Sequence, residues 1–212
     1  MSKWTEPIAI ALDDNETVLL RPLRKSDRAA LAKAAEELSE RSRYNRFHAS
    51  GIRLTQDDLN YLTDVDQDHH VAWVVLDPNT KTGLAVGRYV RDQDDASSAE
   101  IALTVRDQDQ HHGLAKVLLG ALIASAHIGG VTRLHGTLLA SNIPMRCLLT
   151  SLGARLDVNQ TDVVFVDMPT NPVDVPDSPT ARMIRDVAEQ VRENPWLRDK
   201  SEHQMNWTSG VG

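Results

Sequence analysis

The sequence has a single cysteine, few aromatic residues (4%) and no apolar run long enough to cross a membrane. Cys147 on its own cannot form an internal disulfide, and a membrane-spanning helix needs roughly 18 or more consecutive apolar residues. Positive charge is also scarce, with 23 Lys and Arg against 30 Asp and Glu and a formal net charge of −7. Nucleic-acid binding requires a basic surface that follows the phosphates. We therefore expect neither a membrane nor a nucleic acid as a partner.

What is present is enough apolar material, 41% of 212 residues, to bury a sizeable core. The first residues, MSKWTEP, lack the basic and apolar regions of a secretory signal, so the expected compartment is the cytoplasm. Five of the nine prolines lie at or beyond Pro169. This change in composition predicts a domain over residues 1–168 and a C-terminal extension over residues 169–212.

The extension carries the pattern of one short amphipathic helix. Ser178 and Pro179 are typical of a helix start, and Ile184, Val187 and Val191 recur on one helical stripe. Short amphipathic helices usually need tertiary packing, so we expect this helix to dock on its own domain. A helix that binds a partner protein is the alternative.

Strand and helix patterns follow one another along the first 168 residues. Elements in this order indicate an α/β (α+β) fold with one mixed sheet flanked by helices. Apolar runs and alternation predict strands at residues 8–12, 17–20, 71–76, 84–90, 131–139 and 163–166, with a further strand that ends at Val105. Four helices are expected. The first follows the caps Ser26 and Asp27 and ends before the charged stretch 39–46, and the second follows Thr55. The others run from Leu114 to Gly129 and from Asn142 through Leu152.

The strand that ends at Val105 has two unlike faces. With a period of two residues, Ile101, Leu103 and Val105 fall on one face, while Glu100 and Thr104 fall on the other. Glu100 is therefore expected to point away from the apolar face.

The next stretch, VRDQDQHHGLAKVLLGAL (residues 105–122), begins as a strand end and becomes an amphipathic helix. The first N–H groups of a helix lack intrahelical partners and lie at the positive end of the helix dipole, so they attract anions. Gly113 and Ala115 keep side-chain bulk off the turn, and no acidic residue occurs from 110 to 126. A pyrophosphate could approach these amides closely. An ordinary helix start explains the spacing about as well.

The stretch AEIALTVRDQDQHHGLA resembles the acetyl-CoA-binding motif of the GNAT superfamily of N-acetyltransferases, in which a strand leads into a loop of pattern Q/R-x-x-G-x-G/A. Gln110, Gly113 and Ala115 match that pattern. The similarity continues upstream in ETVLLRPLRKSDRAAL and SRYNRF, and downstream in GVTRLHGTLLASNIPM and SLGA. Over about residues 8 to 168, these segments are similar to the GNAT domains of bacterial protein lysine acetyltransferases.

The resemblance implies a mostly antiparallel mixed sheet in which two neighbouring strands splay apart beside bound acetyl-CoA. The pyrophosphate would rest on the loop, and the pantetheine arm would pair with the edge of the strand that ends at Val105. Asn142 matches the family's asparagine that contacts this arm. The residues implied in cofactor binding are Leu103, Val105, Gln110, His111, His112, Gly113, Leu114, Ala115 and Asn142.

Amine acetylation requires the acceptor to lose a proton, because a lysine side chain with a pKa of about 10.4 is almost entirely protonated at neutral pH. Glu100 matches the position at which several family members carry a catalytic glutamate. As a base it would need partial desolvation or a water chain. The alternative is a structural pair with Arg88 or Arg91 across the sheet. His135 is the second candidate base, with a histidine tied into strand packing as its alternative.

Two features depart from the family pattern. Leu149 stands where many relatives have a tyrosine that protonates the leaving thiolate. Loss of this acid would slow the chemistry without preventing it. His112 stands where a basic residue such as arginine is common, and Ala115 where glycine is frequent. A neutral imidazole at 112 would weaken the attraction for the phosphates of CoA.

We expect ordinary structural roles for the other histidines and for the cysteine. Adjacent side chains on a strand point apart, so the histidine pairs at residues 69–70 and 111–112 lack the spacing of zinc ligands, and we expect no metal. Cys147 lies in the apolar stretch of the helix after Asn142, where a buried structural cysteine is expected. We therefore expect direct attack on the thioester without an acyl-enzyme.

The resemblance implies an acetyl-CoA-dependent N-acetyltransferase that acts on a primary amine in a ternary complex, with a protein lysine as the leading acceptor. Three other interpretations stay open: a small-molecule amine acetyltransferase, a non-catalytic CoA-binding regulatory module, and a protein-interaction role for the tail helix. The sequence is also compatible with a homodimer.

Overall fold

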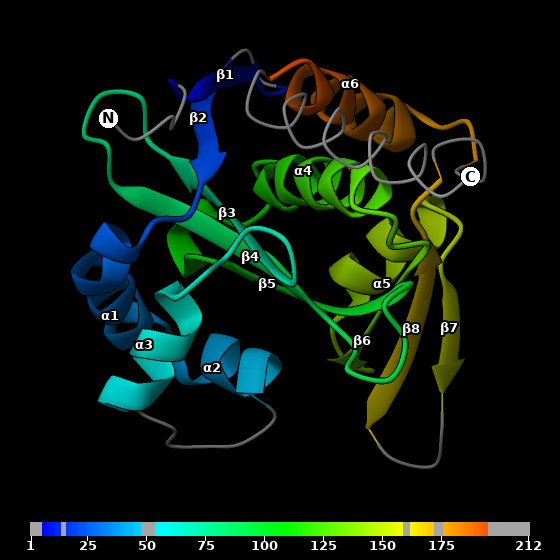
Figure 1. Cartoon of the computed structure of the whole chain (residues 1–212), viewed down its shortest axis with the longest axis horizontal. Helices are drawn as coiled ribbons and strands as arrows, with labels where there is room; N and C mark the ends of the chain where they lie inside the picture. Colours follow the sequence, from blue (N-terminus) through cyan, green and yellow to red (C-terminus); the bar gives the residue numbers. More distant parts are fainter. Residues whose placement is uncertain (1–5, 14–15, 48–53, 159–161, 172–175, 195–212) are drawn as a thin grey trace, which may run out of the picture.

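The computed structural model describes residues 6–13, 16–47, 54–158, 162–171 and 176–194. They form one eight-stranded sheet of order β1-β2-β3-β4-β5-β6-β8-β7, flanked by helices (Figure 1). Neighbouring strands are antiparallel except β5 and β6, which are parallel. The predicted mixed, mostly antiparallel sheet is confirmed. The strands are β1 (Ile8–Ala11), β2 (Thr17–Pro22), β3 (His70–Leu76), β4 (Gly83–Arg91), β5 (Ser98–Val105), β6 (Arg133–Leu139), β7 (Arg155–Val158) and β8 (Val163–Pro169).

Helices cover both faces of this sheet (Figure 1). On one face α4 packs against β3, β4 and β5, and α6 packs against α4. On the other face lie α1, α2 and α3, with α2 in contact with β5 and β6. The described part of the chain contains no helix that is both long and apolar enough to cross a membrane. The helices are α1 (Arg28–Glu37), α2 (Glu40–Phe47), α3 (Gln56–Thr63), α4 (Leu114–Ile128), α5 (Ile143–Ser151) and α6 (Pro179–Glu193), with short 3-10 helices η1 (Lys25–Asp27) and η2 (Asp107–Asp109).

Capping residues begin three of the helices as the sequence predicts. Thr55 and Asp58 form a reciprocal capping box at α3, in which each side chain accepts a hydrogen bond from the other residue's amide. The side chains of Asn142 and Ser178 cap α5 and α6, and each helix has a proline in its first turn. The strands predicted at residues 8–12 and 17–20 form β1 and β2, which pair antiparallel as a hairpin, although its turn residues 14 and 15 lie outside the described residues.

Asp27 precedes α1 but its side chain does not cap the helix, in contrast to the expectation. Its carboxylate accepts two hydrogen bonds from the Arg21 guanidinium, at 2.7 and 2.8 Å, and one from the Arg24 amide at 2.8 Å. Burial alone would raise the pKa of Asp27, but the hydrogen bonds from Arg21 and Arg24 lower it overall. The carboxylate therefore ties the start of α1 to β2.

Two elements were not predicted from the sequence. The charged stretch 39–46, expected only to end the preceding helix, largely forms α2. The four-residue edge strand β7 has mostly exposed side chains. The stretch 39–46 lacks the apolar periodicity of a helix, and β7 alternates polar and apolar residues over four positions only, the shortest run by which a strand is recognised.

The main core lies between the sheet and the helices α4, α5 and α6. Trp73 of β3 is fully buried there, and its indole N–H donates to Ser125 Oγ of α4 at 2.9 Å. Satisfying this N–H avoids the cost of a buried unpaired donor. A second, smaller cluster is formed by Leu23, Ala72, Val74 and Leu76.

The tail helix α6 docks on its own domain, as predicted. Its stripe residues Ile184, Val187 and Val191 are buried in the main core. The helix runs alongside α4 (Figure 1). The division of the chain at residue 168 stays a prediction, and residues 195–212 lie outside the described part.

Candidate active site

The parallel strands β5 and β6 are paired over a short length only. The register joins Ser98 to Arg133, Ala99 to Leu134 and Glu100 to His135. Beyond this point β5 continues beside β4 and β6 continues beside β8, with no β5–β6 pair among the described residues. We call the unpaired segments, residues 101–105 and 136–139, the split. The pairing thus stops where the predicted splayed strand pair requires, although the backbones of Ile101 and Gly136 still lie close together, since a Cβ atom added to Gly136 would come within 2.9 Å of the Ile101 carbonyl oxygen.

Glu100 lies on the sheet face expected from the alternation. Ile101, Leu103 and Val105 pack against the main core, whereas Glu100 is exposed. Paired residues of neighbouring strands point to the same face of a sheet, so His135 shares the face of Glu100. The two candidate bases therefore stand side by side, as the last pair before the split.

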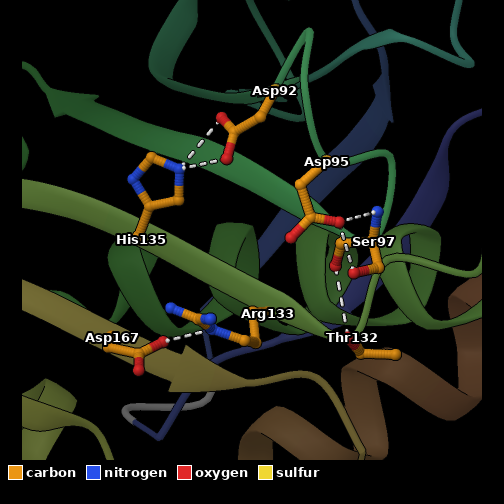
Figure 2. Close-up of polar contacts among 7 residues, drawn as sticks. All are labelled: Asp92, Asp95, Ser97, Thr132, Arg133, His135 and Asp167. Carbon is orange, nitrogen blue, oxygen red and sulfur yellow. Dashed lines mark hydrogen bonds and ion pairs between the residues drawn. The ribbon is translucent and has the colours of Figure 1, made fainter.

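Asp92, in the connection between β4 and β5, was not singled out from the sequence. Its two carboxylate oxygens lie 3.0 and 2.9 Å from Nε2 of His135 (Figure 2). Both side chains are about one third exposed, at 33% and 36%. The two residues are 43 positions apart, so no local pattern could have revealed the contact.

The alternative partners suggested for Glu100 are engaged elsewhere. Arg88 donates to the Leu62 carbonyl and contacts His70 Nε2 at 3.2 Å. Arg91 donates to carbonyl oxygens, including that of Gly129 at 2.6 Å. Within the described residues, the side chain of Glu100 has no hydrogen bond or ion pair. Its carboxylate is thus available to a ligand.

Arg88 also affects the ionisation of His70, which is 7% exposed. Burial, and next the Arg88 guanidinium, lower the pKa of His70 to about 4. His70 is therefore neutral at physiological pH. Its ring packs against that of Tyr61 of α3, with the ring centroids 5.2 Å apart.

The loop after β5 has the geometry of an anion-binding turn. His111 and Gly113 have left-handed backbone angles, with φ of 70° and 83°, and α4 begins at Leu114. The Gly113 carbonyl accepts hydrogen bonds from Lys116 at 2.9 Å and Val117 at 3.2 Å. The N–H groups of residues 113–115 come before the first donors of the helix and have no acceptor within it. They therefore point into the space in front of the helix.

The Gln110 amide does not belong to this cradle. It donates to the Asp107 carbonyl at 3.4 Å. Its side-chain Nε2 contacts Ser42 Oγ of α2 at 3.2 Å. Of the stretch proposed from the sequence, the part beyond Gln110 best fits a diphosphate.

The same loop holds α2 in place. The Asp107 carboxylate accepts hydrogen bonds from the Ser39 amide at 2.9 Å, the Ser39 hydroxyl at 2.7 Å and the Ser42 hydroxyl at 2.6 Å. Burial alone would raise the pKa of Asp107, but these hydrogen bonds lower it overall. Because α2 also contacts β5 and β6, Asp107 links the loop after β5 to a helix that packs on these two strands.

The remaining candidate positions lie on α5. The Asn142 side chain accepts a hydrogen bond from the Met145 amide at 3.3 Å and so begins the helix just beyond β6. Leu149 is 5% exposed and packs in the main core. The prediction of a buried Cys147 is wrong, because the thiol is exposed. At 100° per residue, two positions separate Cys147 from Leu149 by about 200°, which turns the thiol away from the core.

No group of three or more His, Cys, Asp or Glu side chains suited to a metal occurs within the residues that the structure describes.

Comparison with known proteins gives consistent matches. Residues 17–155 match the family model described as acetyltransferase (GNAT) domain. The chain is 33% identical over 193 residues to acetyltransferase Pat of Mycolicibacterium smegmatis, a match that covers 90% of this chain and 58% of Pat. It is 31% identical over 152 residues to acetyltransferase PA5475 of Pseudomonas aeruginosa, with 71% of this chain and 79% of that protein covered.

The structural match is of the same kind. The GNAT domain of S. lividans PAT superposes with a TM-score of 0.71 at 26% identity, covering 77% of this chain and 96% of that domain. The chain spans less than two thirds of the length of the M. smegmatis protein.

Proposed function

Because this chain belongs to the GNAT family of acetyltransferases, we propose that it moves an acetyl group from acetyl-CoA to a primary amine. The observation that carries the proposal is the position of Glu100. Its exposed carboxylate stands at the last β5–β6 pair, where the split begins. A carboxylate at this point lies where an acceptor nitrogen would meet an acyl group held between the strands.

The chain's own groups fit acetyl-CoA as the donor. The amides at 113–115 and the positive end of the α4 dipole suit its diphosphate. The unpaired edge of β5, at Leu103 and Val105, suits the amides of its pantetheine arm. When bound, acetyl-CoA supplies an activated thioester, and the protein supplies orientation and proton transfer.

Each proposed residue has a distinct role in this reaction. Glu100 takes a proton from the acceptor ammonium, and the freed lone pair attacks the acetyl carbon directly. A backbone N–H near Leu103 or Val105 stabilises the developing oxyanion. Cys147 is exposed on α5 and is not needed as a nucleophile.

We propose a protein lysine as the acceptor and the cytoplasm as the compartment. The similarity to acetyltransferase Pat and to the GNAT domain of S. lividans PAT supports this choice. The net charge of −7 is compatible with a cationic acceptor. A small-molecule amine is the competing acceptor.

Two measurements test the proposal. Calorimetry should show binding of acetyl-CoA and CoA, and free thiol should be released when acetyl-CoA is mixed with lysine peptides or small amines. Glu100→Gln should lower kcat by roughly 10² to 10⁴-fold while cofactor affinity stays unchanged. Glu189→Gln, the same exchange at an exposed position of α6, is the matched control.

A non-catalytic CoA-binding module is the second candidate, since Leu149 is buried where relatives carry a catalytic tyrosine. Tight CoA binding without thiol release from any amine would favour this candidate. Absence of CoA binding at tens of micromolar would exclude both.

A further inference from the structure

The contact between Asp92 and His135 determines which ring nitrogen of His135 carries the proton. An ionised carboxylate can only accept hydrogen bonds. Both oxygens of Asp92 lie within 3.0 Å of Nε2, so Nε2 must be the donor. In a neutral imidazole the other nitrogen, Nδ1, then carries the lone pair.

Nδ1 is free to receive a proton. No described residue forms a hydrogen bond with this atom. Figure 2 shows Nδ1 on the ring edge turned away from Asp92, on the side toward which β6 continues from Thr132 through His135. That is the direction of the split, which begins at residue 136. Glu100 is the neighbour of His135 across the strands.

The loop that carries Asp92 is hydrogen-bonded to the residues that start β5 and precede β6. The Asp92 amide donates to the Ser98 carbonyl at 3.0 Å. Asp95 accepts from the Ser97 amide and hydroxyl at 2.9 and 2.6 Å, and the Ser97 carbonyl accepts from the Thr132 amide (Figure 2). A carboxylate on such a fixed loop can orient a neighbouring ring.

A second aspartate nearby does not take this role. Asp167 of β8 is in register with His135, but its carboxylate pairs with Arg133 at 3.2 Å. Asp167 is therefore a natural comparison for Asp92. The two carboxylates flank the same histidine, and Asp92 alone of the two bonds its ring.

We propose that Asp92 is a positioning residue that holds His135 with its proton on Nε2, so that Nδ1 acts as a second proton acceptor beside Glu100. This inference rests on the proposed amine acetylation. The acceptor ammonium first loses one proton to Glu100, which later releases it to solvent. After the C–N bond forms, the nitrogen loses a second proton to Nδ1. The C–S bond then breaks, and the imidazolium, stabilised by Asp92, returns that proton to the sulfur.

In total, these reaction steps convert one ammonium and one thioester into one amide, one thiol and one released proton. His135 thereby supplies the acid that Leu149 cannot. A buried leucine side chain has no proton to give.

Nitrogen-15 NMR of the full chain tests the tautomer without any turnover. His135 is identified among the eight histidines by the signals missing from His135→Gln. At a pH where the ring is neutral, we expect Nε2 to have the shift of a protonated nitrogen and Nδ1 that of an unprotonated one. Asp92→Asn should mix the two forms, while Asp167→Asn should leave them unchanged. Protonated Nδ1 in the unaltered chain would overturn the inference.

Kinetics test the proton-accepting role. Asp92→Asn and His135→Gln should each lower kcat by roughly 10²-fold with little change in KM for acetyl-CoA. The double variant should be no slower than His135→Gln alone, because the two side chains act as a unit. Unchanged kcat in His135→Gln would refute the role, even if Glu100→Gln is inactive. An inactive unaltered chain would instead refute the proposed function and the catalytic part of this inference with it.

Discussion

Gly120 of α4 lies directly against Val187 of α6. A Cβ atom added to Gly120 would come within 2.8 Å of Val187 Cβ and of the Ile184 carbonyl oxygen. Real Cβ atoms do not approach backbone so closely, so the absence of a side chain at 120 allows α6 to pack on α4. The tail helix thereby supports α4, the helix that follows the loop of His111 to Gly113.

Replacing Gly120 with alanine should therefore destabilise the fold. Overpacking against a helix backbone costs about 1–3 kcal/mol, which exceeds the gain in helix propensity of about 1 kcal/mol. Urea unfolding measures the difference. Gly83→Ala is the control, because a Cβ there meets only Val74 at 3.9 Å. Equal stability of the two variants would contradict the tight packing of α6.

Alanine substitutions at Gly113 and Gly130 distinguish an effect of backbone strain on stability from an effect on cofactor binding. They lie next to opposite ends of α4 with φ of 83° and 78°, and an added Cβ meets no atom closer than 3.6 Å at either position. Alanine at each site should cost about 1–2 kcal/mol of stability, since both angles are left-handed. Calorimetry with CoA should show weakened binding for Gly113→Ala alone. Equal affinity of both variants would remove the loop from the cofactor site.

His70 makes the fold sensitive to mild acid. Its pKa is about 4 in the folded chain and about 6.5 in the unfolded chain, so only the unfolded chain binds this proton between those values. The stabilising contribution is complete above pH 6.5 and decreases as the pH falls toward 4, by up to roughly 3 kcal/mol.

Free energies of unfolding at several pH values, for the unaltered chain and His70→Gln, measure this effect. The pH dependence should be shallower in His70→Gln. His69→Gln changes the exposed neighbouring residue and is the control. An unchanged slope in His70→Gln would contradict the burial of a neutral ring.

Asp107 should control the attachment of α2. Asp107→Asn removes the charge that accepts hydrogen bonds from Ser39 and Ser42, so amides of α2 should exchange with solvent about tenfold faster. Asp109→Asn alters the same loop but affects a pair with Arg106 instead, and should leave α2 unchanged. Because the pKa of Asp107 is lowered in the folded chain, the attachment is complete at neutral pH and is lost as the pH falls through that value.

The sequence predicts elements whose signals are local. The helix start at Thr55 and the alternation from Glu100 to Val105 are read within a few residues, and both are confirmed. The position of α2 and the partner of His135 are set by side chains that are distant in sequence. Asp107 reaches Ser39 over 68 positions, and Asp92 reaches His135 over 43. Such contacts exist only once the sheet has formed.

The short pairing of β5 and β6 also limits how far a ligand can enter between the two strands. An extended ligand that pairs with the free edge of β5 can reach no further than the last β5–β6 pair, Glu100 with His135. One additional residue pair would shift this limit by about 3.3 Å, the rise of a single strand residue. The backbone register of β5 and β6 therefore sets where such a ligand ends, next to the polar side chains of the last pair.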